Sequence, residues 1–202
     1  MYPRTEIRRV ILMSTLAAFA ITAGLVPAGI ARAQDSGYKH DLLASIEDAR
    51  GKLIDLADAT PVAKYAWRPG KGVRSTGEVF LHVAQANYLI PTLLGVAVPE
   101  GVEAMKIEKS AADKAKTIEL LKASFDHAEE AIRNTSDADL DKTVKIFDHD
   151  GTMRDVEMII LSHAHEHLGQ SIAYARMNGI VPPWTAREQA EAAKAKDKTK
   201  GM

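Results

Sequence analysis

Apolar residues recur at alternating spacings of three and four along four segments of the chain. This spacing places them on one face of an α-helix, so each segment predicts an amphipathic helix with one buried side. The four stripes are Leu42, Ile46, Ala49, Leu53 and Leu56; Val79, His82, Ala86, Leu89 and Leu93; Ile118, Leu121, Phe125, Ala128 and Ile132; and Val156, Ile160, His163, His167, Gln170, Tyr174 and Met177. Four such helices predict an all-α fold, a four-helix bundle around one apolar core.

Residues that favour helix ends flank the four stripes. Ser75-Thr76-Gly77-Glu78 has the form of a capping box before the second helix, and residues 110–113 are suited to start the third. Thr60-Pro61 ends the first helix. Pro91 removes one backbone hydrogen bond, so we expect a kink near the end of the second helix. Gly179, with two prolines following, ends the fourth.

Two connections carry information of their own. Residues 95–110 form a long link which, at about 3.3 Å per residue, can run the length of a bundle, so the second and third helices can be parallel. Residues 142–154, which hold Val144, Ile146 and Asp150-Gly151, predict a small hairpin. We therefore expect the folded domain at residues 38–184. The Ala-, Lys- and Glu-rich residues 185–202 are expected to form a disordered polar tail.

Residues 1–33 have the form of a signal peptide. Three arginines among the first nine residues precede an apolar stretch from residue 10 to 30, and Ala31-Arg32-Ala33 is a small-x-small cleavage site. This pattern predicts a periplasmic or secreted protein that begins at Gln34 and is free of the membrane after cleavage. The apolar stretch is long enough to span a bilayer, so a retained anchor is the alternative. Adjacent arginines leave both ordinary secretory and twin-arginine export open.

The composition excludes several classes of function. Without the leader the chain carries 22 basic and 26 acidic residues, which argues against a nucleic-acid partner. Aromatic residues make up 5% of the chain, too few for a surface that stacks bases. The absence of cysteine excludes disulfides, thiolate zinc sites and cysteine nucleophiles. A small-molecule substrate and a homodimer stay open.

Three of the seven histidines interrupt apolar stripes, and these are the candidate metal ligands. His163 and His167 are four residues apart, which is about 40° of rotation and about 6 Å of rise, so both side chains lie on one helix face. His82 occupies the core stripe of the second helix and is the best third ligand. Imidazole is the commonest metal ligand, and we expect the three side-chain nitrogens to come within about 4 Å of one another around one divalent ion.

The same residues have plainer interpretations. A single histidine in a helical stripe is more often a hydrogen-bonded core residue than a ligand. His165 lies about 200° around the helix from His163, so we do not expect it to share an ion, and the spacing excludes an HExxH protease motif. Glu166 and Gln170 are candidate hydrogen-bond partners of the ligands, and Tyr174 is expected in the core. The remaining histidines are expected to be solvated: His40, His127 and His149.

At these residues the sequence resembles the DinB-like superfamily of four-helix proteins. Three segments carry the resemblance: residues 75–83 with one histidine, residues 161–170 with HxxxH and a glutamine three residues on, and the Gly-Ile-Val-Pro ending at 179–182. The resemblance covers about residues 38–184. It implies an up-down-down-up bundle with a long crossover between helices 2 and 3. It also implies a metal site on His82, His163 and His167 that binds nickel, zinc or a similar divalent ion.

Two functions follow as expectations. Some members of the superfamily are thiol-dependent transferases or isomerases, which implies a metal-dependent hydrolase or transferase that acts on a small electrophilic substrate. Characterised thiol-dependent members use cytoplasmic thiols, so hydrolysis is favoured over thiol transfer for an exported protein. The alternative is a non-catalytic exported metal-binding or stress-associated protein. A bundle whose histidines bind nothing is a third hypothesis.

Overall fold

The structure, a computed structural model, describes residues 28–110 and 113–200 and is mostly helical. Its elements are α1 (Ala28–Ala59), η1 (Val62–Lys64), α2 (Thr76–Leu89), η2 (Ile90–Leu94), η3 (Ala104–Lys106), α3 (Lys114–Asn134), η4 (Asp137–Asp139), β1 (Thr143–Ile146), β2 (His149–Thr152), α4 (Met153–Met177) and α5 (Pro183–Lys200), where η marks a 3₁₀ helix. The prediction of a helical fold is confirmed.

The predicted signal peptide falls mainly outside the described residues, which begin at residue 28. Helix α1 starts at Ala28 and therefore passes through the predicted cleavage position between Ala33 and Gln34. In the part of the chain that the structure describes, no helix combines the length and the apolar character needed to cross a membrane.

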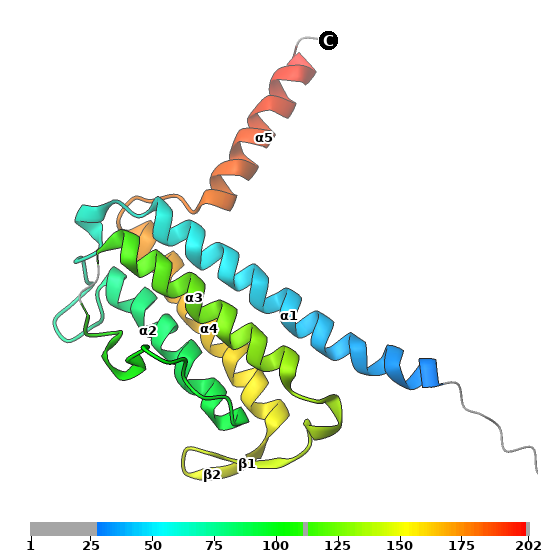
Figure 1. Cartoon of the computed structure of the whole chain (residues 1–202). Helices are drawn as coiled ribbons and strands as arrows, with labels where there is room; N and C mark the ends of the chain where they lie inside the picture. Colours follow the sequence, from blue (N-terminus) through cyan, green and yellow to red (C-terminus); the bar gives the residue numbers. More distant parts are fainter. Residues whose placement is uncertain (1–27, 111–112, 201–202) are drawn as a thin grey trace, which may run out of the picture.

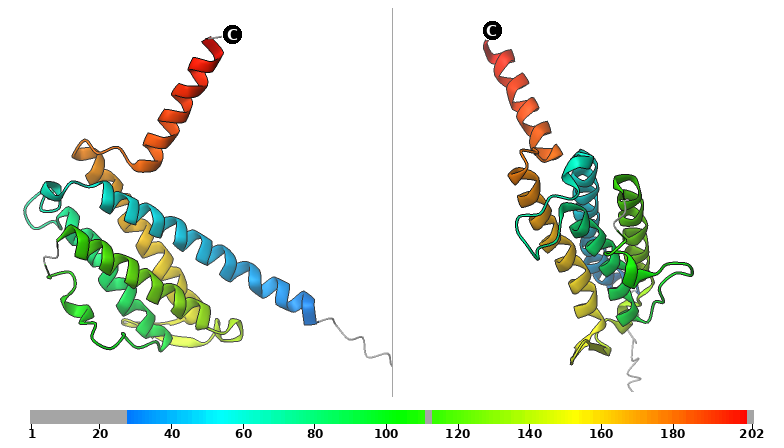
Figure 2. Two further views of the ribbon diagram at one scale, coloured as in Figure 1. Left: turned by 45° about the horizontal axis from the view of Figure 1, so that its top comes forward. Right: turned by 90° about the vertical axis from the view of Figure 1, so that its left-hand side faces the viewer.

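Helices α1 to α4 pack against one another. Helix α1 contacts α3 and α4, and α2 contacts the same two helices. Figure 1 shows α2 and α3 running in the same direction, with α1 and α4 running the opposite way. The chain that joins α2 to α3 returns to the end of the molecule where α2 begins. Helix α5 points away from the other four in both views of Figure 2.

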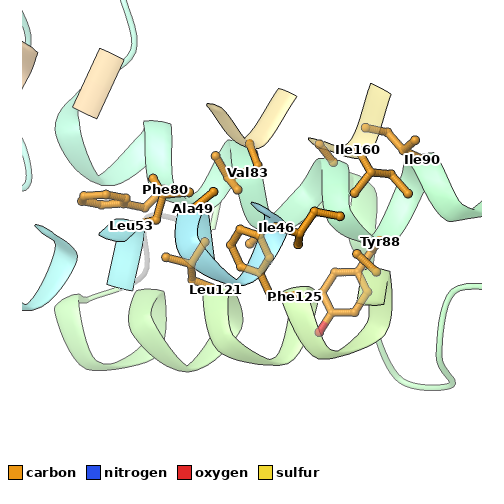
Figure 3. Close-up of a cluster of buried hydrophobic side chains, with 14 of the residues drawn as sticks. Ile46, Ala49, Leu53, Phe80, Val83, Tyr88, Ile90, Leu121, Phe125 and Ile160 are labelled. Atoms are coloured by element: carbon orange, nitrogen blue, oxygen red, sulfur yellow. The ribbon is translucent and has the colours of Figure 1, made fainter. Parts of the chain in front are cut away.

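The predicted apolar stripes meet in one core, which holds the four helices in register. The large side chains from α1 to α4 that are less than 2% exposed include Ile46, Leu53, Phe80, Leu121, Phe125 and Ile160. Figure 3 shows these residues interdigitated between the helices. Close packing of this kind fixes the rotation of each helix, and so fixes which side chains each helix presents to its neighbours.

The start of α2 is fixed by the predicted capping box. The Ser75 hydroxyl accepts a hydrogen bond from the Glu78 backbone N–H (3.3 Å), and Glu78 Oε2 accepts one from the Ser75 N–H (2.7 Å). Gly77 allows the close approach of Tyr65, because a Cβ atom here would lie 3.0 Å from Tyr65 Cδ1. The Gly77 N–H donates to the Tyr65 carbonyl oxygen at 2.9 Å. These contacts set where His82, on the second turn, will lie.

Helix ends and the hairpin follow the sequence signals, with one difference in form. Helix α1 ends at Ala59, and the side chain of Asp113 caps α3 by accepting from the Lys116 N–H at 2.8 Å. The hairpin forms, with Ile146 opposite His149. The predicted kink at Pro91 appears instead as a change of helix type, since α2 gives way to η2 at residue 90. The missing N–H of proline explains the change.

The predicted disordered tail differs from the structure. Residues 183–200 form the helix α5, and nearly all of its side chains are exposed. Alanine, lysine, glutamate and glutamine are strong helix formers, so this segment needs little tertiary support to become helical. The weak apolar pattern correctly indicates that the segment adds little to the core, but it does not exclude a helix.

Candidate metal centre

Three histidines from two helices meet at one place. His82 lies on α2, and His163 and His167 lie one turn apart on α4, which packs against α2. One ring nitrogen from each of the three lies within 4.8 Å of the other two, and the Nε2 atoms of His82 and His163 are 3.3 Å apart. The sequence therefore predicted correctly which histidines come together. The expected 4 Å separation is met by the His82–His163 pair.

The site is set into the molecule but not sealed. His167 is 7% exposed, whereas His82 and His163 are half-buried. Ile160 and Ala164, on the same helix as His163, are fully buried and keep this face of α4 against the core. Such a setting leaves part of the cluster accessible from outside.

His167 is oriented by a hydrogen-bonded chain along α4. The Gln170 amide nitrogen donates to the Tyr174 hydroxyl at 3.0 Å, so the amide oxygen of Gln170 faces Nδ1 of His167 at 2.8 Å. An amide oxygen only accepts, and His167 therefore carries its proton on Nδ1 and leaves Nε2 free. Tyr174 in turn packs edge-on against Trp67, with ring centroids 5.4 Å apart. The predicted role of Gln170 is confirmed by this contact.

His82 has a charged partner that the sequence did not indicate. Oε2 of Glu108, which lies in the connection between α2 and α3, is 2.8 Å from Nδ1 of His82. Arg74 donates from Nε to the other carboxylate oxygen of Glu108 at 2.7 Å. Because an ionised carboxylate only accepts hydrogen bonds, His82 carries its proton on Nδ1. Its Nε2 lone pair is therefore directed toward His163.

The electrostatic setting keeps His82 and His163 neutral at ordinary pH. Burial lowers the pKa of His163 to about 4, and the neighbouring imidazoles of His167 and His82 add to that effect. Burial also lowers the pKa of His82, against the opposing hydrogen bond to Glu108. Burial alone would raise the pKa of Glu108, but hydrogen bonds from Arg74 and His82 outweigh it and lower that pKa. Metal binding requires neutral imidazoles.

The other candidate residues lie elsewhere. His165 is exposed, and its Nδ1 faces the Leu161 carbonyl oxygen at 3.1 Å, so it points away from the cluster as expected. Glu166 is exposed too, which removes it as a partner of the ligands. His40 and His149 are exposed, as predicted.

The prediction that His127 is solvated is wrong. It is half-buried, its ring lies 5.3 Å from that of Tyr88, and burial lowers its pKa. Its neighbour in space, Tyr88, comes from α2, where the sequence stripe gave no sign of the contact.

Solved structures share this fold, and a family model matches most of the folded domain. The family model described as the DinB superfamily matches residues 45–171, more than half of the chain. A crystal structure of a DinB-like protein from Bacillus cereus is 17% identical with a TM-score of 0.61, over 70% of this chain and 93% of that one. A DinB-like protein from Bacillus subtilis is 18% identical with a TM-score of 0.57, over 70% and 94%. No curated protein matches the sequence.

Proposed function

Because the chain belongs to the DinB superfamily and brings three histidines to one point, we propose that it binds one divalent metal ion through His82, His163 and His167. The observation that carries this proposal is the 3.3 Å separation between Nε2 of His82 and Nε2 of His163. Two nitrogens bound to one tetrahedral ion at about 2.0–2.1 Å lie about 3.3–3.4 Å apart. The Nε2 atoms of His82 and His163 therefore have the spacing of two ligands of one ion.

The alternative of hydrogen-bonded core histidines fits His163 poorly. Its Nδ1 is buried and has no hydrogen-bond partner among the described residues, whereas its Nε2 lies within hydrogen-bond distance of Nε2 of His82, at 3.3 Å. A buried polar atom without a partner costs free energy. An ion bound to Nε2 would account for the partial burial of the His163 imidazole.

The donor set also limits the metal. Three imidazoles suit zinc, nickel, copper or iron, and disfavour magnesium and calcium, which prefer oxygen ligands. We propose nickel, zinc or a similar ion. An ion of this kind, held by three neutral ligands, keeps its full charge and makes bound water acidic.

The activity we propose for this centre is hydrolysis of a small electrophilic substrate. Thiol transfer ranks below it, because the chain has no cysteine and any thiol would have to come from outside. The protein's part is to orient the ligands: Glu108 holds His82 and Gln170 holds His167. The family and the three donors support metal binding more directly than they support turnover.

A non-catalytic metal-binding protein is the second candidate, and one observation favours it. Hydrolysis needs a group that accepts a proton from water. The carboxylate that reaches the cluster, Glu108, is already engaged by both Arg74 and His82. Tyr174 is hydrogen-bonded to Gln170.

Metal analysis of the protein purified from its native export compartment tests the proposal. We expect about one zinc, nickel or similar ion per chain, removable by a chelator and restored by dialysis against the metal. Protein that is isolated without metal and takes up none would contradict metal binding under either candidate function.

We infer that residues 1–33 direct the chain to the periplasm or out of the cell, and intact-mass analysis of the exported form should give a chain that begins at Gln34.

We also infer an up-down-down-up four-helix bundle from α1 to α4, supported by the directions of the helices in Figure 1. In that order the crossover passes beside α2 and brings Glu108 to His82.

A further inference from the structure

Glu108 is held in place from three directions, although it lies in an irregular connection. The buried side chain of Ile107 anchors the chain beside it. The Glu108 backbone N–H donates to Oε1 of Gln85 on α2 at 3.2 Å. Arg74 donates to both carboxylate oxygens, at 2.7 and 3.4 Å. The carboxylate thus has a defined position before any ion is considered.

The outer nitrogens of the three histidines have different surroundings. His82 donates to a carboxylate, His167 donates to the neutral amide of Gln170, and Nδ1 of His163 is buried and has no hydrogen-bond partner in the described part of the chain. A carboxylate on the far nitrogen fixes the tautomer of an imidazole and makes the near nitrogen a stronger metal donor. This effect is concentrated at His82.

We propose that Glu108 is a positioning residue of the metal centre, and that the ion and the connection between α2 and α3 stabilise each other. This inference rests on the proposed metal binding and adds a residue to it. A bound ion withdraws electron density from the His82 ring, which strengthens its Nδ1–H bond to Glu108. The coupling is reciprocal: if the contact with Glu108 strengthens metal binding by a given free energy, bound metal stabilises the packing of the connection between α2 and α3 by the same free energy.

Arg74 completes the arrangement by balancing charge. In the absence of the ion, the guanidinium neutralises Glu108 beside neutral imidazoles. When an ion is present, the carboxylate faces positive charge on both sides. Arg74 therefore keeps Glu108 in place, although its own positive charge lies near the site.

The test compares Glu108→Ala and Glu108→Gln with the wild type in the full mature chain, with Zn²⁺ as the probe. Glu103→Gln is the matched control, because Glu103 lies in the same connection, is exposed and pairs only with Lys106 among the contacts of the described chain. Competition with a chromophoric chelator should show Zn²⁺ affinity lowered about 10–100-fold by Glu108→Ala. Glu108→Gln should recover part of the loss, because the amide oxygen still accepts from His82.

Two further measurements separate positioning from general stability. Nitrogen-15 NMR of the imidazoles should find His82 protonated on Nδ1 in the wild type and no longer restricted to that tautomer in Glu108→Ala. Hydrogen exchange of residues 102–110 should slow on Zn²⁺ addition in the wild type and in Glu103→Gln, but not in Glu108→Ala.

The outcomes are distinguishable. Wild-type protein that fails to bind Zn²⁺ or any related ion would overturn the proposed function itself. Binding by the wild type together with unchanged affinity in folded Glu108→Ala would overturn only the role of Glu108. Equal losses in Glu103→Gln would do so too, because they would trace the effect to the connection in general.

Discussion

The Nε2 atoms of His82 and His163 lie 3.3 Å apart, although 81 residues separate the two histidines in the sequence. Their meeting is a product of the packing of α2 on α4 around the core in Figure 3. The site consequently exists only when the tertiary fold is complete. Metal affinity is then a measure of correct helix packing as well as of ligand chemistry.

Single ligand substitutions should divide the neighbouring histidines into two classes. His163→Ala or His167→Ala should weaken Zn²⁺ binding by more than the ~100-fold expected for loss of an outer partner. His165→Ala should leave affinity nearly unchanged, because its side chain is exposed and directed away from the cluster. Calorimetric titration of the three variants provides the comparison. Equal losses from all three would contradict the placement of the cluster on one helix face.

Turnover should depend on the ion if the protein is an enzyme. We expect the metal-loaded protein to hydrolyse a member of a panel of small esters, amides and other electrophiles, because metal-bound water is a nucleophile near neutral pH. His163→Ala should abolish the activity, and His165→Ala should retain it. Turnover that survives in His163→Ala would exclude the metal-centred mechanism. Absence of turnover with every substrate would favour the non-catalytic candidate.

Two glycine substitutions should have opposite effects on stability. Gly77→Ala brings a Cβ to 3.0 Å from Tyr65 Cδ1 and 3.3 Å from the Tyr65 carbonyl oxygen, so we expect a loss of about 1–3 kcal/mol. Gly51→Ala, inside α1, meets nothing within 4 Å and should stabilise the helix by about 0.5–1 kcal/mol. Urea unfolding measures both. The same sign for both variants would show that backbone freedom, and not the contact with Tyr65, determines the result at Gly77.

Stability should fall with rising pH on account of Glu157. This residue is 0% exposed, and burial raises its pKa from the ordinary 4.5, with the Asp137 carboxylate adding to the rise. The folded state therefore binds the proton more tightly than the unfolded state. The stability that this group contributes is present below the unfolded pKa and is lost as pH rises through the folded pKa.

Glu157→Gln should remove that pH dependence. The variant should match the wild type near pH 4 and exceed its stability by about 1–3 kcal/mol at pH 7.5, because a buried charge without full compensation is replaced by a neutral amide. Denaturant unfolding at both pH values gives the comparison, with the exposed Glu130→Gln as control. A variant less stable than the wild type at pH 7.5 would show that the Lys39 ammonium compensates the Glu157 charge.

Helical periodicity was sufficient to identify the three histidines but not their partners. His82, His163 and His167 each fall in a stripe whose other members are buried, and a buried stripe can face only the other helices. Helical spacing also predicts the contact of Gln170 with His167, because the two residues are three positions apart on one helix. Glu108 was not, because the segment that carries it has no repeating pattern and its position depends on contacts with Arg74 and Gln85.

The other differences have equally local causes. The polarity of residues 185–202 predicts disorder, although the helix propensity of the segment is high. The position of His127 off the apolar stripe predicts a solvated side chain, but Tyr88 of the neighbouring helix packs against it. In both cases the outcome depends on what the segment packs against. Periodicity within a segment does not specify its packing partners.

Connections between helices are usually the places where a chain gains or loses residues without harm, since they run over the surface. The link between α2 and α3 lacks that freedom. It leaves η2 at Gly95, in a left-handed conformation, and must deliver Ile107 to the core and the adjacent carboxylate to His82. One residue inserted between these points would move the acid off the imidazole, whereas one inserted beside the exposed Phe147 of the hairpin would disturb neither. The length of this link therefore belongs to the proposed metal centre, as do the three histidines.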